Sequence, residues 1–223
     1  MIDIFEVVSK EEFEKYEEII NNGLYNDVSL VLAVINSVFS ISARYESTIK
    51  VVNRFADYVG IDRSKDEYTT SQFMKQFYDV DSEILANDVF GNRQRTSAVN
   101  GILKAEATKQ VIKVLNDNKI ETQKDLLHCE YIDTVEMQIR RVKGQSSGIT
   151  FEYLMMNVGD DNRFKPDRHI YTFFGEYLKY GSLTEEKLRE VFFNELEKVK
   201  EKYPYFTARS FDSLIWTFIK STY

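Results

Sequence analysis

The sequence predicts an all-α protein, and three features carry that prediction. Its 223 residues include only nine glycines and two prolines, a composition typical of a helical chain with few tight turns. Apolar residues recur at helical spacing along most of the chain. Serine, threonine and aspartate residues stand as caps before several of these periodic segments. The hydrophobic content of 43% suits a globular core, and the length suits one large or two small domains.

The first two helices are predicted from a cap and from an apolar stripe. Ser9 and Glu12 have the spacing of a capping box, so a helix is expected from there to about residue 21, ending at Asn22-Gly23. Asp27 is expected to open a second helix. Its apolar face is wide enough for a core helix and includes Val31, Val34, Val38 and Ile41.

The middle of the chain alternates periodic and polar segments. Helices are predicted over residues 49–59, ending at Gly60, over residues 71–77, and after Asp81. Residues 90–96 are expected to form a mostly polar segment that connects two helices. From Ser97 the apolar spacing predicts a helix of about 18 residues, and Thr122 caps a short turn after it.

Residues 131–180 then give the most informative pattern: a helix, a tight turn, a second helix, a polar loop and a third helix. The first helix stops at Lys143-Gly144-Gln145-Ser146-Ser147-Gly148, where Gly144 allows positive φ. Asp167 is the expected N-cap of the third helix, because Pro166 cannot lie inside a helix. Ser182 is expected to cap the following amphipathic helix, and Thr207 or Ser210 the last one.

This central order resembles the helix-hairpin-helix DNA glycosylase superfamily, which includes endonuclease III and the alkylbase glycosylases. The family hairpin reads apolar-Pro-Gly-apolar-Gly, and the chain has Val142-Lys143-Gly144-Gln145-Ser146. The family's catalytic loop reads Val-Asp-Thr-His, and the chain has Pro166-Asp167-Arg168-His169. Lys143, Gln145 and Ser146 depart from the family hairpin. The resemblance covers residues 88–180.

The resemblance implies two helical subdomains with a cleft between them. Residues 1–90 plus 181–223 would form one, and residues 91–180 the other, which contains the helix-hairpin-helix motif. It also implies hydrolysis of the N-glycosidic bond of a flipped-out nucleotide. Asp167 would stabilise the sugar cation or orient a water molecule. Gly148 stands near the place of the catalytic lysine of bifunctional members, so a monofunctional enzyme is expected.

The tight turn is also the expected contact with double-stranded DNA. Consecutive backbone amides that lead into a helix N-terminus form a phosphate site, and basic side chains near it add positive charge. The residues expected to bind DNA are Lys143, Gly144, Ser146, Ser147, Gly148, Arg140, Arg141 and Arg168. An ordinary turn with a solvated basic helix end explains the same residues without a ligand.

Charge and composition restrict the remaining classes. The net charge of −7 argues against nucleic-acid binding by the whole surface. The single cysteine, Cys129, excludes an internal disulfide and a four-cysteine iron–sulfur cluster, and two histidines exclude a His-rich metal site. No metal or cofactor is therefore expected. The chain has no apolar run of membrane-spanning length and no signal-peptide pattern, so we expect a cytoplasmic protein without a membrane partner.

The sequence is also compatible with two other functions. One is a non-catalytic DNA-binding or interaction module of the same helical fold, which the acidic charge and the altered hairpin favour. The other is a helical interaction or phage-defence protein unrelated to DNA repair. The state of Asp167 separates the enzyme from the module, because only the enzyme needs that carboxylate for chemistry.

Overall fold

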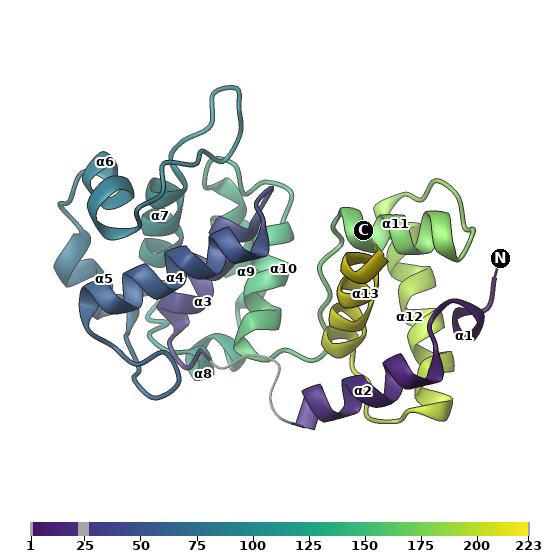
Figure 1. Ribbon diagram of the computed structural model, residues 1–223. Helices are drawn as coiled ribbons and strands as arrows, with labels where there is room; N and C mark the ends of the chain where they lie inside the picture. The colour runs from purple at the N-terminus through teal and green to yellow at the C-terminus, as the bar shows by residue number, and fades with distance from the viewer. Residues whose placement is uncertain (1, 22–26, 223) are drawn as a thin grey trace. The chain divides into compact units, whose positions relative to one another are not determined.

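The computed structural model describes residues 2–21 and 27–222, and within these residues it contains helices and no strands (Figure 1). The predicted all-α fold class is therefore confirmed. The chain forms two compact units. We call residues 1–25 and 160–223 the terminal unit, and residues 26–159 the central unit. The predicted end of the first long helix, Asn22-Gly23, lies outside the described residues.

Each unit is built from several helices. The central unit contains α3 (Leu30–Ser40), α4 (Tyr45–Val59), α5 (Thr70–Phe77), α6 (Ser82–Ile84) with a π-helical turn (Leu85–Val89), α7 (Lys104–Asp117), α8 (Gln123–Leu127), α9 (Ile132–Arg141) and α10 (Ile149–Val158). The terminal unit contains α1 (Ile4–Val7), α2 (Lys10–Asn21), α11 (Arg168–Thr172) with a π-helical turn (Phe173–Tyr177), α12 (Glu185–Lys202) and α13 (Ala208–Thr222).

These units have different boundaries from the expected subdomains. Residues 26–90 were expected to pack with the chain ends, but they belong to the central unit, because α3 packs against α7 and α10 as well as α4. Residues 160–180 were expected in the hairpin subdomain, but they belong to the terminal unit, where α11 packs against α13. Asp167 consequently lies in the terminal unit, whereas residues 143–148 lie in the central unit.

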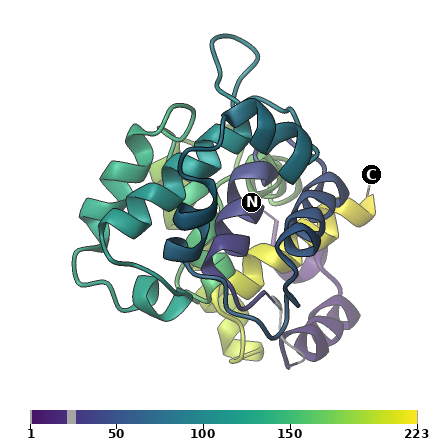
Figure 2. The same cartoon turned by 90° about the vertical axis from the view of Figure 1, so that its left-hand side faces the viewer.

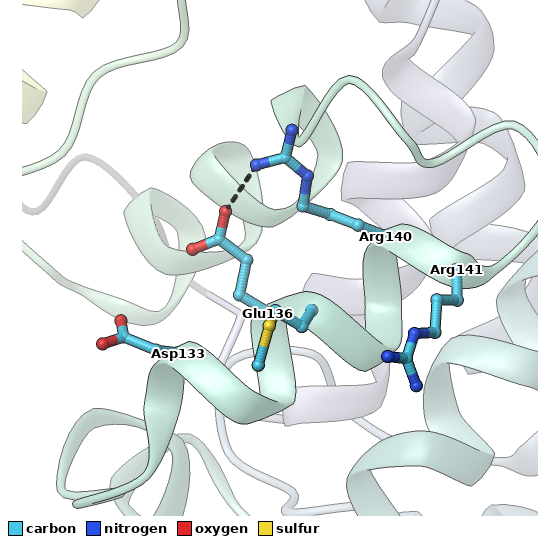
Figure 3. Close-up of a pocket in the computed structure, with 5 residues that line it drawn as sticks. Asp133, Glu136, Arg140 and Arg141 are labelled. Atoms are coloured by element: carbon cyan, nitrogen blue, oxygen red, sulfur yellow. Dashed lines mark hydrogen bonds and ion pairs between the residues drawn. The ribbon is translucent and has the colours of Figure 1, made fainter.

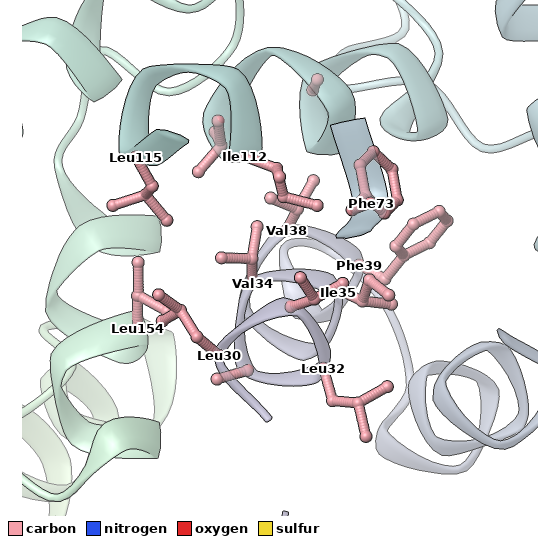
Figure 4. Close-up of a cluster of buried hydrophobic side chains, with 14 of the residues drawn as sticks. Leu30, Leu32, Val34, Ile35, Val38, Phe39, Phe73, Ile112, Leu115 and Leu154 are labelled. Atoms are coloured by element: carbon pink, nitrogen blue, oxygen red, sulfur yellow. The ribbon is translucent and has the colours of Figure 1, made fainter. Parts of the chain in front are cut away.

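Helix α3 is the centre of the central unit. All residues from Leu30 to Phe39 are buried, as expected for a helix that is apolar on every side. Figure 4 shows Val34 and Val38 directed toward α7 and Leu30 toward α10. The side chains of Ile112, Leu115 and Leu154 lie on the facing sides of these two helices. The polar Ser37 is accommodated by hydrogen bonds. Its hydroxyl donates to the carbonyl of Ala33 and accepts from Asn157 Nδ2 at 2.9 Å.

Several predicted caps are confirmed and two are wrong. Ser9 and Glu12 form the predicted capping box. The cap of α3 is Ser29, because the Asp27 carboxylate instead binds the Arg63 guanidinium at 2.6 and 2.8 Å. The cap of α12 is Thr184 rather than Ser182, since the helix begins two residues later than the sequence suggested.

The predicted helix from Ser97 begins only at Lys104. Residues 92–103 form a loop, here called the projecting loop, which stands out from the helices of its unit in Figures 1 and 2. Its two sides pair in antiparallel fashion, since the Thr96 amide donates to the Ile102 carbonyl and the Lys104 amide to the Gln94 carbonyl, each at 2.8 Å. Asn100, at φ +57°, makes the reversal that a helix would not allow.

The terminal unit has a core dominated by aromatic rings. Phe164 and Phe192 stack with their centroids 3.9 Å apart, and Phe174 and Phe211 pack against Phe192. All four side chains are buried. This packing fixes the residues just before Asp167 to helix α12.

Among the described residues, no helix is both long enough and apolar enough to cross a bilayer.

Replacing Phe55 by alanine should strongly destabilise the central unit. Its fully buried ring packs against the rings of Tyr68, Phe73 and Phe90, with centroids 5.6–5.9 Å away. We expect a loss of about 3–5 kcal/mol in the free energy of unfolding, measured by urea denaturation. Tyr78→Ala is the control, because Tyr78 is 57% exposed and its loss should cost no more than about 0.5 kcal/mol. Equal losses in the two variants would contradict this assignment of the core.

Candidate functional site

Asp167 lies at the beginning of α11 and is its N-cap, as predicted. Its carboxylate Oδ1 accepts the amide hydrogens of His169 at 2.8 Å and Ile170 at 3.5 Å. The side chain is 22% exposed, so solvent still reaches the carboxylate. The cap geometry thus holds the acid in a fixed position without burying it completely.

Three ionisable side chains surround this carboxylate or its loop. Lys165 Nζ lies 3.8 Å from Asp167 Oδ2, and His169 Nδ1 lies 3.6 Å from Asp167 Oδ1. His169 Nδ1 is buried and has no hydrogen-bond partner among the residues described. Asp212, on α13, accepts the backbone amide of Lys165 at 2.7 Å and is 7% exposed. We call Lys165, Asp167, His169 and Asp212 the acidic cluster.

The two carboxyl groups of the acidic cluster titrate in opposite directions. Burial by itself raises the pKa of Asp167, but contacts with His169 and the positive charge of Lys165 outweigh it and leave the pKa below its usual value. Burial, with the charge of Asp167, raises the pKa of Asp212 to about 8. Burial also lowers the pKa of Lys165. At neutral pH the cluster therefore contains an ionised Asp167 beside a protonated Asp212.

Nothing in the acidic cluster forms a metal site. In the described part of the chain, no three His, Cys, Asp or Glu side chains are grouped closely enough to hold a metal ion. Asp160 and Asp161 instead pair with Arg163 at 3.3 Å and Arg209 at 3.0 Å.

The turn between α9 and α10, residues 142–148, has a specific conformation. Gly144 has φ +89°, and a Cβ atom there would lie 2.3 Å from the Thr96 Cβ. Gln145 is buried and accepts a hydrogen bond from the Thr150 hydroxyl. This contact gives the buried polar side chain of Gln145 a hydrogen-bond partner next to the turn. Gly148, at φ +80°, is the N-cap of α10.

The surface of this turn offers both amides and positive charge. The amides of Gln145 and Gly148 donate to the carbonyls of Val142 and Gln145, and those of Gly144, Ser146 and Ser147 have no acceptor among the described residues. Arg141 and Lys143 are exposed. The Arg140 guanidinium already has partners within the protein: it donates to the Ser146 carbonyl at 3.2 Å and to the Glu136 carboxylate at 3.3 Å. The turn and the two free-standing basic side chains fit a phosphate group.

The projecting loop meets this turn. The close approach of Thr96 to Gly144 places the base of the loop directly against residues 143–145. The loop carries Arg93, bound to Glu83 at 2.8 Å, and Arg95, whose Nε donates to the Gly101 carbonyl at 3.0 Å. At its tip Val99 is 78% exposed. The sequence indicated neither this contact nor the shape of the loop.

Helix α9 also forms one side of a surface hollow. The hollow is lined by Asp133, Glu136, Met137, Arg140 and Arg141, and Figure 3 shows Glu136 and Arg140 directed toward each other on this helix. Glu136 and Arg140 pair across one helical turn. The hollow contains two acidic and two basic side chains, so it is a poorer anion site than the adjacent turn.

The structure therefore separates the predicted site residues into two groups. Asp167 and the exposed Arg168 lie in the terminal unit, and the other predicted DNA-binding residues lie at the α9–α10 turn of the central unit. Sequence reasoning did not identify Asp212 as a partner of the Asp167 loop. Its only signal was an acidic residue within the apolar face formed by Phe211, Leu214 and Ile215.

The raised pKa of Asp212 predicts how stability changes with pH. Unfolded, this carboxyl titrates near pH 3.9. Folded, it titrates near pH 8, so between these values the folded chain holds a proton that the unfolded chain has released. The free energy of unfolding should therefore fall as pH rises from about 4 to 8. In Asp212→Asn the part of this pH dependence that comes from Asp212 should be missing. Urea denaturation of wild type and Asp212→Asn at pH 5, 6.5 and 8 measures the difference. If the free energy of unfolding changes equally with pH in both proteins, the raised pKa of Asp212 is contradicted.

Comparison with known proteins identifies the family of the chain. Residues 7–220 match a family described as Domain of unknown function (DUF8548). No curated protein and no solved structure matches the chain. Because the match extends over nearly the whole sequence, the protein belongs to the DUF8548 family.

Proposed function

We propose that this protein is a monofunctional base-excision enzyme that hydrolyses an N-glycosidic bond in DNA. Asp167 is its catalytic carboxylate, and the α9–α10 turn binds the DNA backbone. The observation that carries the proposal is the state of Asp167: an ionised, solvent-accessible carboxylate held by backbone amides at a helix N-terminus. The resemblance of residues 88–180 to the helix-hairpin-helix glycosylases supports the same chemistry.

The reaction requires a fixed negative charge more than a strong base. As the bond between the sugar C1′ and the base nitrogen breaks, positive charge develops on the sugar. A carboxylate already oriented by the protein stabilises that charge without reorganisation. A water molecule bonds to C1′ and passes one proton to Asp167, while the base leaves with the electrons of the broken bond and takes up a proton from solvent. Asp167 then releases its proton to solvent and is ionised again. The low pKa of Asp167 keeps it ionised at the start of this sequence.

DNA binding is assigned to the central unit. The amides of Gly144, Ser146 and Ser147 would bind one phosphate, and Arg141 and Lys143 would add charge. The contact would be independent of base sequence, as backbone contacts are. The central unit has 16 Lys and Arg against 18 Asp and Glu, so the local basic surface lies on a nearly neutral background. Most of the excess acidic charge of the chain is in the terminal unit.

A non-catalytic DNA-binding module is the second candidate. The observation that favours it is that the hydrogen bonds of Asp167 fully account for the residue as a helix cap. In that case the phosphate site of the central unit would operate without chemistry. The two functions predict the same DNA binding and differ only in base release.

Asp167→Asn should abolish base release while leaving DNA binding intact. The amide still accepts the His169 amide hydrogen, so the cap and the fold are kept, but the negative charge is lost. Wild type is first incubated with duplexes containing alkylated, oxidised or deaminated bases, and released base is measured by chromatography. We expect at least about a 100-fold slower release by Asp167→Asn on the duplex that wild type processes.

The outcomes separate the two functions. Equal rates in wild type and Asp167→Asn would exclude Asp167 as the catalytic carboxylate. DNA binding by wild type without release of any base in the panel would favour the non-catalytic module.

Substituting the basic residues of the turn should weaken DNA binding and its salt dependence. In Arg141→Gln/Lys143→Gln, two phosphate contacts are lost, so the slope of log K against log salt should decrease in magnitude by about 2. Fluorescence anisotropy with a labelled duplex at several salt concentrations measures this slope. The matched control is Lys75→Gln, an exposed lysine of the same unit on α5, which should leave the slope unchanged. A slope unaffected by the double substitution would place the DNA surface elsewhere.

A further inference from the structure

We propose that Asp212 is a positioning residue for the base-excision reaction: through the backbone of Lys165, its carboxyl group holds Asp167 in the conformation needed for catalysis. This inference rests on the proposed function and assigns a role to a residue 45 positions away from Asp167 in the sequence. It follows from a chain of short contacts that links the core of the terminal unit to the candidate catalytic acid.

The first link is between α13 and the loop. Asp212 Oδ2 accepts the Lys165 amide hydrogen at 2.7 Å. Asp212 is itself nearly buried and stands among the buried side chains of Phe211, Leu214 and Ile215. A carboxyl group on a helix packed in this way has little freedom, so it fixes the Lys165 backbone relative to the core.

The second link is between Lys165 and Asp167. The Lys165 carbonyl accepts the Asp167 amide hydrogen at 2.7 Å, which closes a tight three-residue turn. Pro166, at the centre of this turn, is buried and has a restricted φ. The conformation of Lys165 therefore determines where the Asp167 backbone lies. On its other side, Asp167 is fixed by the amides of His169 and Ile170.

The same loop is anchored immediately before Lys165. Phe164 stacks on Phe192 of α12 with 8° between the ring planes. The aromatic contact fixes the entry to the loop, but it does not specify the orientation of the following peptide. That orientation comes from the hydrogen bond with Asp212, because it is the contact made by the Lys165 amide itself.

The charges around Asp212 are consistent with a positioning role. The groups that act on it are Lys165 and Asp167 of the loop, and Tyr16 of α2 lies near enough for Asp212 to influence its pKa. Because burial raises its pKa to about 8, Asp212 is neutral at pH 7. A neutral Asp212 accepts the Lys165 amide hydrogen without adding a second negative charge that competes with Asp167 for the Lys165 ammonium.

The test compares Asp212→Ala with Asp212→Asn in the full chain, using the lesion duplex that wild type processes at pH 7. Alanine removes the acceptor, so kcat should fall at least about tenfold through misplacement of Asp167. KM should be unchanged, because the phosphate contacts are in the central unit. Asparagine retains an acceptor oxygen and should restore kcat to within about threefold of wild type. Circular dichroism confirms that each variant is folded at the assay temperature.

Glu195→Ala is the matched control. Glu195 is a buried acid of the same unit, and its hydrogen bonds join Tyr180 at 2.7 Å and Lys198 at 2.6 Å. Its loss should leave kcat unchanged at a temperature where the variant is folded. A similar fall of kcat in Glu195→Ala, or wild-type kcat in Asp212→Ala, would overturn the positioning role while the proposed function stands. A wild type that releases no base overturns both.

If Asp212→Ala does not fold, the pH profile of Asp212→Asn replaces it. Above pH 8 the wild-type Asp212 ionises, and its negative charge repels the Asp167 carboxylate, so wild-type kcat should fall. The asparagine variant has no such ionisation and should lack this fall. Parallel profiles from pH 7 to 9.5 would overturn the inference.

Discussion

The complete burial of α3 is the constraint on which the central unit depends. A helix that is apolar on every side has to be surrounded, and α4, α7 and α10 together with α5 surround it. Covering α3 in this way brings segments that are far apart in the sequence into one core. The same packing leaves the α9–α10 turn and the projecting loop at the surface, and Thr96 against Gly144 joins them. The candidate DNA-binding surface is therefore a consequence of how one buried helix is enclosed.

The acidic cluster shows how similar residues acquire different states within one unit. Asp167 and Asp212 are both aspartates near Lys165, but one caps a helix and the other lies on the core face of α13. Hydrogen bonds and positive charge favour the ionised form of Asp167, whereas burial favours the protonated form of Asp212. A pair of carboxyl groups with separated pKa values is useful wherever one has to remain charged and the other has to act as a neutral hydrogen-bonding group. This difference gives the terminal unit its candidate chemistry.

The proposed activity and its alternatives depend on different parts of the molecule. Phosphate binding needs the glycine conformation at position 144 and the exposed Arg141 and Lys143, all in the central unit. Hydrolysis needs the charge of Asp167, in the terminal unit. A chain that kept the first and lost the second would bind DNA without cleaving a bond. The overall charge of −7 is compatible with either, because a phosphate contact is a local property of a few residues.

The sequence by itself determined the features that depend on residues close together in the chain. Helical periodicity gave the fold class, and local capping gave Ser9, Thr122 and Asp167 correctly, because an N-cap bonds to amides only two or three positions away. Asp27 and the segment after Ser97 were misinterpreted, since a salt bridge to Arg63 and the antiparallel pairing of residues 94–104 outweighed local preference. Tertiary structure alone decided the unit boundaries, the contact of Thr96 with Gly144, and the bond from Asp212 to Lys165. Each of these joins residues that are distant in the chain, and no local pattern encodes which buried surfaces will meet.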